Sequence, residues 1–424
     1  MSLVESVDPC IANSPGRPTG GQENRASAVH PRFLGNTSPN SSDQQNWRRT
    51  SGAFTRFGWK SCPFCLRRLV IAVALTLAAT ISAEGRTWKD RSGQMLIEAD
   101  MVGHAGDKVW LQQIDDDLRL VAIDDLDPQD QQFARQQIQK QGSHPSGDVP
   151  PGMRATAYLP GRTIATLADP AIDESSGLAC SRRTPGVFWT HNDSGDAARL
   201  YAFDRKGRDL GSFLLRNVQA FDWEDMASWS LAGKNYLLIG DTGNNGRNAG
   251  VHMLYLVEEP EVDPVRGVQT REMPVTQVVH FSYEDEYRDC EALAVDPTSR
   301  TVLLVSKEKW MVCYAYALYW PENDPRKAFV ARRIATLRLP LVTAMDVSPD
   351  GCRAVLLTYG DAYEFLRAKG EGWGQAFSRR PNPIALPGRR QGESICYGPD
   401  GKTLYLTSEK GPTPLIEILP VEKQ

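Results

Sequence analysis

The stretch DWEDMASWSLAGKNYLLIGDTG, residues 222–243, contains the pattern from which the fold can be predicted. It predicts a short strand, a turn and a second strand that ends in the small residue Gly240. The same pattern recurs along the chain, and self-similarity at regular intervals predicts a repeat architecture. The other copies begin at Asp173, Asp289, Val342 and Gln391.

The spacing of the copies predicts the number of repeats. Their heads lie at Glu174, Glu224, Glu291, Ala344 and Glu393. Each interval of about 50 residues also holds two further strand-like runs, and four strands in such a length predict one blade of a β-propeller. The last copy has only three strands, and RTIATLADP (162–170) can supply the fourth and close the ring. We therefore predict an all-β fold with five blades in residues 155–424. The alternative is six blades. The sixth would have to lie in the longer interval after Glu224, which is too short for two blades.

The beginning of the chain predicts export. CLRRLVIAVALTLAATISAEGRTW (65–88) has a basic flank, a short apolar core and small residues after it, so 67–83 is predicted as a secretory signal. The core is short for a span of about 20 residues. Residues 1–66 are polar and are predicted to be disordered, or to precede a true start further along the chain. The alternative is an uncleaved signal anchor, the only membrane attachment that we expect. We predict an exported protein that is periplasmic, envelope-associated or secreted.

Residues 86–138 predict a small SH3-like barrel of short strands separated by turns. Asp127 and Pro128 predict the cap and first residue of a helix at its end. RTWKDRSGQ, EADMVG, GDKVWLQ and IDDLDPQDQQF in this segment resemble the Sla-one homology domain, type one. In a eukaryotic endocytic adaptor such a domain binds short peptides, so the resemblance implies a peptide or protein partner; a spacer is the alternative. The polar, Pro- and Gly-rich residues 139–154 predict a linker.

Residues 163–420 also resemble a group of exported bacterial propellers. The matching motifs are HNDSGD, DWED, GDTGNN, EALAVDP, SPDG with TYG, and QGES with PDG and TSE. Related propellers include phytase-like and esterase-like hydrolases and sugar- or calcium-binding modules. The resemblance implies the fold and the position of a site, and it implies no particular reaction.

Acidic residues at the repeat heads predict a cation site. The first strand of each propeller blade lines the central channel, so these carboxylates are expected to meet there. Oxygen ligands at this density suit Ca²⁺, and the histidine spacing disfavours zinc. A structural ring that accepts backbone hydrogen bonds, or carboxylates acting directly in catalysis, are the alternatives. The predicted metal ligands are Asp193, Asp222, Glu224, Asp241, Glu291 and Glu393.

Two further groups of residues surround this predicted centre. His191, beside Asp193, is the candidate general base, with a hydrogen-bonded structural histidine as the alternative. Four residues are candidates for binding a ligand or an anion such as phosphate. These are Lys307, Arg288, Asn192 and Asn244.

The cysteines that follow the signal predict no disulfide framework, because their number is odd and they are evenly scattered. Most are expected to be small core residues. The sequence leaves any pairing after export open. They are Cys180, Cys290, Cys313, Cys352 and Cys396.

These observations favour a binding or scaffold function. The net charge of −4 gives no support to a nucleic-acid partner. The barrel is expected to bind a peptide or protein, and the acidic mouth of the propeller channel a cation or small ligand. The alternative is a Ca²⁺-dependent hydrolase of phytase-like or esterase-like type that acts on a phosphate ester.

Overall fold

The structure is a computed structural model. It describes residues 86–105, 107–113, 118–141, 147–193, 195–244, 252–308, 312–320, 329–339 and 341–421. The predicted extension 1–66 and the predicted signal 67–83 lie outside the described residues. Within the described residues, no helix has the length and apolar content needed to cross a membrane.

The N-terminal part is a small β domain. Its strands β1 (Arg86–Lys89), β2 (Met95–Ala105), β3 (Lys108–Gln112) and β4 (Leu118–Ala122) form one antiparallel sheet in chain order. A 3₁₀ turn η1 (Ile123–Asp125) and the helix α2 (Pro128–Gln141) follow. Asp127 caps this helix as predicted, since its Oδ1 accepts the Asp130 N–H at 2.8 Å. Trp88, Leu111 and Leu126 have no exposed surface and lie in its core.

The remaining strands, apart from β13, form a ring of five four-stranded units, here called blades. The first blade has β6 (Ser175–Cys180), β7 (Val187–Asn192), β8 (Arg199–Asp204) and β9 (Asp209–Leu215). The second has β10 (Trp223–Leu231), β11 (Lys234–Asp241), β12 (His252–Glu258) and β14 (Gln277–Tyr283). The third has β15 (Cys290–Asp296), β16 (Thr301–Ser306), β17 (Cys313–Tyr319) and β18 (Phe329–Leu337). The fourth has β19 (Val342–Val347), β20 (Arg353–Thr358), β21 (Ala362–Leu366) and β22 (Asn382–Ile384), with the short helix α3 (Trp373–Ala376) before β22. The fifth has β23 (Gln391–Tyr397), β24 (Leu404–Glu409), β25 (Pro414–Ile418) and β5 (Arg162–Thr166).

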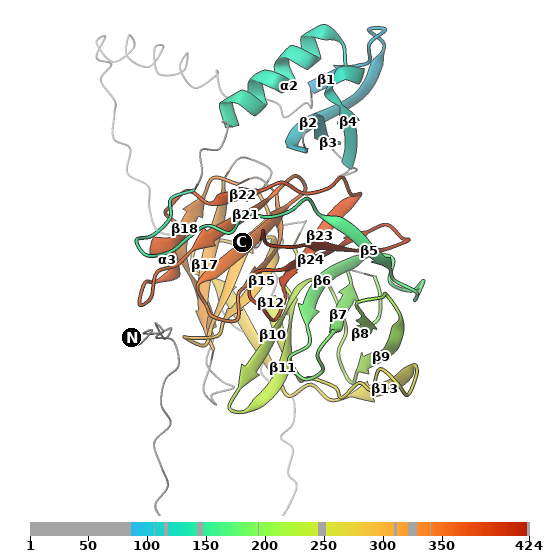
Figure 1. Ribbon diagram of the computed structural model, residues 1–424, viewed down its shortest axis with the longest axis vertical. Coiled ribbons are helices and arrows are strands. Elements are labelled where there is room, and N and C mark those ends of the chain that lie inside the picture. Colours follow the sequence, from blue (N-terminus) through green and yellow to red (C-terminus); the bar gives the residue numbers. More distant parts are fainter. Residues whose placement is uncertain are drawn as a thin grey trace, which may run out of the picture. The chain divides into compact units, whose positions relative to one another are not determined.

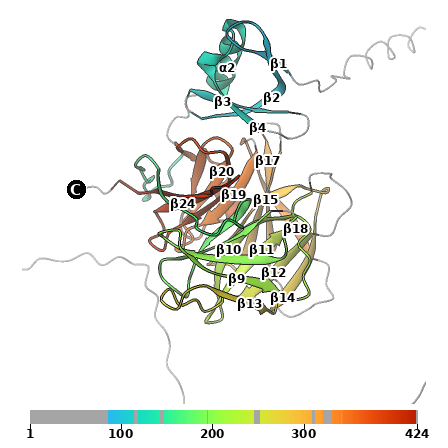
Figure 2. The ribbon, with the colours of Figure 1, turned by 90° about the vertical axis from the view of Figure 1, so that its right-hand side faces the viewer.

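The blades close into a ring through their first strands. β6, β10, β15, β19 and β23 each pack against the next, and β23 packs against β6. The pairing of β5 with β25 completes the fifth blade, as the sequence predicted. Strands β6 to β9 lie side by side in Figure 1, and β10, β11, β12 and β14 in Figure 2. This is the arrangement of a β-propeller-like domain.

The longer interval after Glu224 adds a strand to a neighbouring blade. β13 (Gln269–Met273) pairs in parallel with β9 of the first blade. Gly211 permits this approach, because a Cβ there would lie 2.0 Å from the Gln269 carbonyl oxygen. β14 also pairs in parallel with β18, which joins the second and third blades into one eight-stranded sheet. The described part of this interval therefore holds no sixth blade.

Part of the predicted linker 139–154 belongs to regular structure. Helix α2 continues to Gln141. The Gly147 N–H donates to Asn382 Oδ1 at 3.0 Å, and Arg380 forms an ion pair with Asp148 at 2.8 Å. The segment from 147 onward is thus fixed along the edge of the fourth blade.

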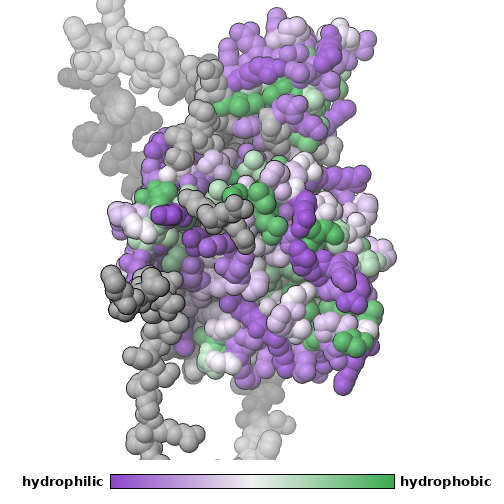
Figure 3. Space-filling view, viewed as in Figure 1, coloured by the Kyte–Doolittle hydropathy of each residue, from purple (hydrophilic) through white to green (hydrophobic). Residues whose placement is uncertain are grey.

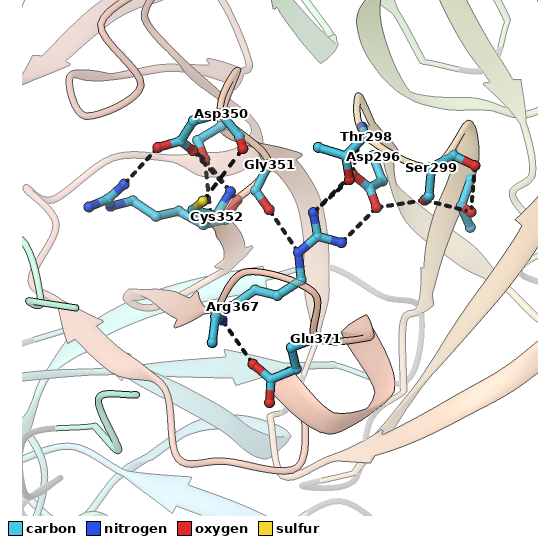
Figure 4. Close-up of polar contacts among 12 residues, drawn as sticks. Asp296, Thr298, Ser299, Asp350, Gly351, Cys352, Arg367 and Glu371 are labelled. Atoms are coloured by element: carbon cyan, nitrogen blue, oxygen red, sulfur yellow. Dashed lines mark hydrogen bonds and ion pairs between the residues drawn. The ribbon is translucent and has the colours of Figure 1, made fainter. Parts of the chain in front are cut away.

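Buried apolar residues and a few buried ion pairs hold the blades together. Hydrophilic residues predominate on the face in Figure 3, with small hydrophobic groups between them. At the seam of the third and fourth blades, Arg367 donates to both carboxylate oxygens of Asp296, at 2.7 and 3.1 Å (Figure 4). The guanidinium also donates to the Gly351 carbonyl at 2.8 Å and lies over the Trp373 ring. The Arg367 guanidinium therefore links the end of β15 in the third blade to the segment that follows β21 in the fourth.

Candidate functional site

The beginning of each blade's first strand departs from regular pairing. Such bulges re-aim side chains, and they are common next to functional sites. Glu224, Glu291 and Glu393 lie at three of the five irregularities, and each is only 3% exposed. The irregularities fall between Ser175 and Gly177, Trp223 and Met226, Cys290 and Ala292, Val342 and Ala344, and Gln391 and Ser394.

Five carboxylates from three blades converge at these strand beginnings. Asp193, Asp222 and Glu224 offer oxygens that all lie within 4.8 Å of one another. Glu224, Asp289 and Glu291 do the same, so Glu224 belongs to both triads. We call these five residues the acidic centre. The structure brings together residues far apart in sequence, as the repeat pattern predicted.

The DWED motif of the second blade divides its carboxylates between two roles. Asp222 and Glu224 belong to the acidic centre, whereas Asp225 accepts backbone N–H groups of Leu293 and Met345 at 2.9 Å. Those donors lie on the first strands of the third and fourth blades. Asp225 therefore ties three blades together. Burial raises the pKa of its carboxyl, and these hydrogen bonds oppose the rise.

Gly243 lies against the acidic centre from the loop after β11. A Cβ at this position would lie 2.1 Å from Glu224 Oε1 and 2.5 Å from Asp222 Oδ2. No side chain fits there unless the carboxylates move. The glycine of the GDTG sequence thus allows the loop backbone to approach the carboxylate oxygens.

The acidic centre raises the pKa of its own members. Burial, followed by the charges of Asp193, Asp289 and Asp241, raises the pKa of Asp222 to about 7. Burial and the Glu291 charge raise the pKa of Glu224 well above its usual value. Carboxylates that lie close together and are partly shielded from solvent must bind protons or a cation.

Lys307 compensates one side of the acidic centre. Its Nζ lies 2.5 Å from Glu291 Oε1 and 5.1 Å from the centroid of the Tyr359 ring. Burial alone would lower the pKa of Lys307, but Glu291 and the neighbouring acids hold it well above its usual value. Burial raises the pKa of Glu291, and Lys307 opposes that rise. The second triad therefore already has a cationic partner.

The fifth blade adds acids beside this pair. Glu393 Oε1 accepts Gln391 Nε2 at 3.0 Å, while its buried Oε2 has no hydrogen-bond partner among the described residues. Burial and the charge of Glu393 raise the pKa of Glu409 to about 9. Glu174, which forms an isolated bridge with Glu409, is exposed. Glu393 lies outside both triads, although the sequence predicted it as a ligand.

Asp241, another predicted metal ligand, also lies outside the two triads. Its carboxylate accepts the backbone N–H groups of Asp222 at 2.9 Å and Phe221 at 3.3 Å. Asp241 thus holds the segment that carries Asp222 and Glu224. Asp289 belongs to the second triad in its place, and its Oδ1 accepts the Asn244 N–H at 2.8 Å. The position of Asp289, two residues before the repeat head Glu291, is the sequence feature that could have indicated its place in the second triad.

The structure places His191 in the interior of the protein. It has no exposed surface, and its ring meets the Trp223 ring edge-on. Nδ1 lies 2.9 Å from the Asn192 carbonyl oxygen, and Nε2 has no hydrogen-bond partner among the described residues. Burial lowers the pKa of His191 to about 4. This geometry gives a neutral core histidine, with no approach for a substrate or water.

The predicted anion-binding residues already have partners. Arg288 forms ion pairs with Asp285 at 2.8 Å, Glu286 at 2.7 Å and Glu308 at 3.1 Å. Asn192 Nδ2 donates to the Ala171 carbonyl at 2.6 Å and to Asp196 at 3.0 Å. Together with the pairing of Lys307, these contacts leave little positive charge for a phosphate.

Comparisons with known proteins identify one of the two parts. Residues 80–141 match the SLA1 homology domain 1 (SHD1) family, as the sequence motifs indicated. No curated protein matches the chain. The chain is similar to the structure of a gluconolactonase from Xanthomonas campestris, with 12% identity, a TM-score of 0.38, and coverage of 80% of this chain and 88% of that one. It is also similar to a proposed 6-phosphogluconolactonase from Bacteroides uniformis, with 14% identity, a TM-score of 0.31, and coverage of 61% and 69%. Matches at these TM-scores assign no activity to this chain.

Proposed function

We propose that this protein is a two-part binding protein whose five-bladed β-propeller holds a Ca²⁺ ion at Asp193, Asp222 and Glu224. The observation that supports this most is the triad itself, three carboxylates within 4.8 Å of one another. Three close negative charges repel strongly unless a cation or protons compensate them. Oxygen donors of this kind suit a hard divalent cation, and Ca²⁺ accepts six to eight of them.

Two contrasts favour the first triad over the second as the cation site. Lys307 is paired with Glu291 of the second triad. Asp193 and Asp222 are only partly buried, whereas Asp289 and Glu291 are buried. A hydrated ion can therefore approach the first triad and retain water ligands. Gly243 supports the same assignment, because its missing side chain leaves the oxygens of Glu224 and Asp222 open to the loop backbone.

The N-terminal domain is the second binding part in this proposal. Its match to the SHD1 family supports a peptide ligand for the SH3-like barrel. The signal-like segment 67–83 supports an exported protein. A peptide array probed with the full chain tests the first point: sequence-selective binding is expected, and uniform binding would contradict it.

The Ca²⁺-dependent phosphate-ester hydrolase receives less support. Such a reaction needs a base near the metal and cations for the phosphate. His191 is enclosed in the core, and Arg288 and Lys307 are paired with acids. The geometry therefore favours binding, and a screen of phosphate esters with calcium present is expected to show no turnover.

Calcium titration of the full chain after chelation tests the cation site. We expect heat of binding in calorimetry and a rise in melting temperature, because a ligand at 100 times its Kd adds about 2.7 kcal/mol to stability. Glu224→Gln should abolish both effects. Glu258→Gln, at an exposed ion pair with Lys234, is the matched control and should leave both unchanged. Binding that persists in Glu224→Gln, or is absent from the natural protein at millimolar calcium, would contradict the proposal.

A further inference from the structure

Two cysteines meet at the seam where the ring of blades closes. Cys180 is the last residue of β6 in the first blade, and Cys396 lies in β23 of the fifth. Their Sγ atoms are 3.7 Å apart, although 216 positions separate them in the sequence. Both are free thiols. No pattern in the sequence indicates this pair, because the two strands become neighbours only when the ring closes.

We propose that Cys180 and Cys396 are a disulfide-forming pair that locks the fifth blade to the first. A disulfide has an S–S length of about 2.05 Å, so the sulfur atoms must approach by about 1.7 Å. A rotation about one Cα–Cβ bond moves Sγ over distances of this order. Two other described cysteines have hydrogen-bond partners on the backbone. Cys290 donates to the Val305 carbonyl at 3.2 Å, and Cys352 to the Asp350 carbonyl at 3.5 Å.

The two thiols have unequal access to an oxidant. Cys396 is 1% exposed, whereas Cys180 is partly exposed at the edge of an apolar cluster that includes Phe188 and Tyr405. Burial, together with the neighbouring Cys180 thiol, raises the pKa of Cys396. Cys180 is therefore the thiol that reacts first with an external oxidant.

The oxidant in this proposal is a small-molecule or protein disulfide. The Cys180 thiolate attacks one sulfur of that disulfide, which forms a mixed disulfide and releases one thiolate of the oxidant. Cys396 then loses its proton to solvent and attacks Cys180 Sγ, which displaces the second thiolate. Two protein thiols are oxidised by two electrons to one disulfide, and the oxidant is reduced to two thiols. The raised pKa of Cys396 makes the second step the slower one.

The bond would reinforce a seam that non-covalent contacts hold. Ser175 Oγ lies 2.7 Å from Thr407 Oγ1 across the same two blades, and β5 completes the fifth blade by pairing with β25. Opening the ring requires these contacts to break together. A covalent link between β6 and β23 would keep the first strands adjacent even when β5 detaches.

Oxidation of the folded full chain with oxidised glutathione tests the proposal. Peptide mapping without reduction should yield a Cys180–Cys396 cross-link, and the melting temperature should rise by about 5 °C and return after dithiothreitol. Cys180→Ser should lose the rise, and Cys352→Ser should keep it. Glutathione retained on Cys180 without the cross-link would overturn the proposal. A cross-link that forms only in urea would also overturn it, because the pair would then not belong to the folded ring. Mapping of the natural chain decides the matter even if a variant fails to fold.

Discussion

Replacing Asp222 by asparagine should stabilise the calcium-free protein at neutral pH and destabilise the calcium-loaded one. The pKa of Asp222 is raised to about 7, first by burial and then by Asp193, Asp289 and Asp241. The folded state therefore retains a proton that the unfolded state has lost above about pH 4. The calcium-free protein thus loses stability as the pH rises from about 4 to 7. Asparagine cannot ionise, so the variant avoids this loss.

The size of the effect follows from the shift. A rise from 3.8 to about 7 corresponds to about 4 kcal/mol, at 1.36 kcal/mol for each pKa unit. Asp222 is only partly buried, and solvent screening reduces this value to about 2 kcal/mol. At pH 4, where both side chains are neutral, the natural protein and Asp222→Asn should have similar free energies of unfolding. At pH 7 in a chelator, the variant should be about 2 kcal/mol more stable.

Urea unfolding, monitored by near-ultraviolet circular dichroism at several pH values, measures the free energy of unfolding with chelator and with calcium. It therefore tests both the stabilisation expected without calcium and the destabilisation expected with it. With calcium the order should reverse, because the variant lacks one ligand of the proposed site. Asp400→Asn is the control: hydrogen bonds from Thr403 and Lys402 hold the pKa of Asp400 below its usual value although burial opposes them. Asp400→Asn should therefore lower the stability at pH 7. If Asp222→Asn were no more stable than the natural protein at pH 7 in chelator, the electrostatic account of the acidic centre would be refuted.

Three further substitutions test other parts of the structure. Gly243→Ala should weaken calcium binding by at least about tenfold, measured by calorimetry, because the added Cβ displaces the Glu224 carboxylate. The circular dichroism spectrum should stay native. An unchanged calcium affinity would place the cation elsewhere. Arg367→Met leaves Asp296 buried without its partner and should lower the free energy of unfolding by about 3–5 kcal/mol, against at most about 1 kcal/mol for Arg332→Met at an exposed pair. Asp127→Ala removes the cap of α2 and should cost about 1 kcal/mol, measured by hydrogen exchange in 128–141; unchanged exchange would show that the cap is dispensable.

Repetition made much of the fold predictable. The alternation of strands and turns predicted the blades, and the incomplete last repeat predicted that β5 pairs with β25. The longer interval could not be interpreted from the pattern alone. Its extra strand, β13, pairs with β9 of the preceding blade, and that depends on a close approach at Gly211 between segments distant in sequence.

The sequence predicted where the candidate site lies better than it predicted which residues form it. The repeat heads predicted that Asp222, Glu224 and Glu291 converge. Which neighbouring acid joins them depends on bulges and on backbone donors, which the pattern does not show. Asp241 binds backbone N–H groups, and Asp289 joins the second triad.

His191 and the cationic candidates show a different limit of the sequence. Burial decides whether a histidine at the end of a strand reaches a ligand, and His191 packs against Trp223 instead. The charge of Arg288 is directed to Asp285, Glu286 and Glu308. Asp285 and Glu286 lie in the same short segment as Arg288, so the sequence could have shown these partners, whereas the contact of His191 with Trp223 joins two blades and no local stretch encodes it.

A purely structural role for the acids at the repeat heads fits some of them and leaves Glu224 unexplained. Asp225 accepts backbone N–H groups of Met226, Leu293 and Met345, so the scaffold stabilises that buried carboxylate directly. Asp241 likewise receives two backbone donors. Among the described residues, no such donor reaches the carboxylate of Glu224, which is 3% exposed and faces four other acids. A buried carboxylate in that position must be neutralised by a proton or by a cation. The pH dependence expected for Asp222→Asn distinguishes these two states. A proton neutralises the carboxylates in the calcium-free protein, and the cation neutralises them in the calcium-loaded protein.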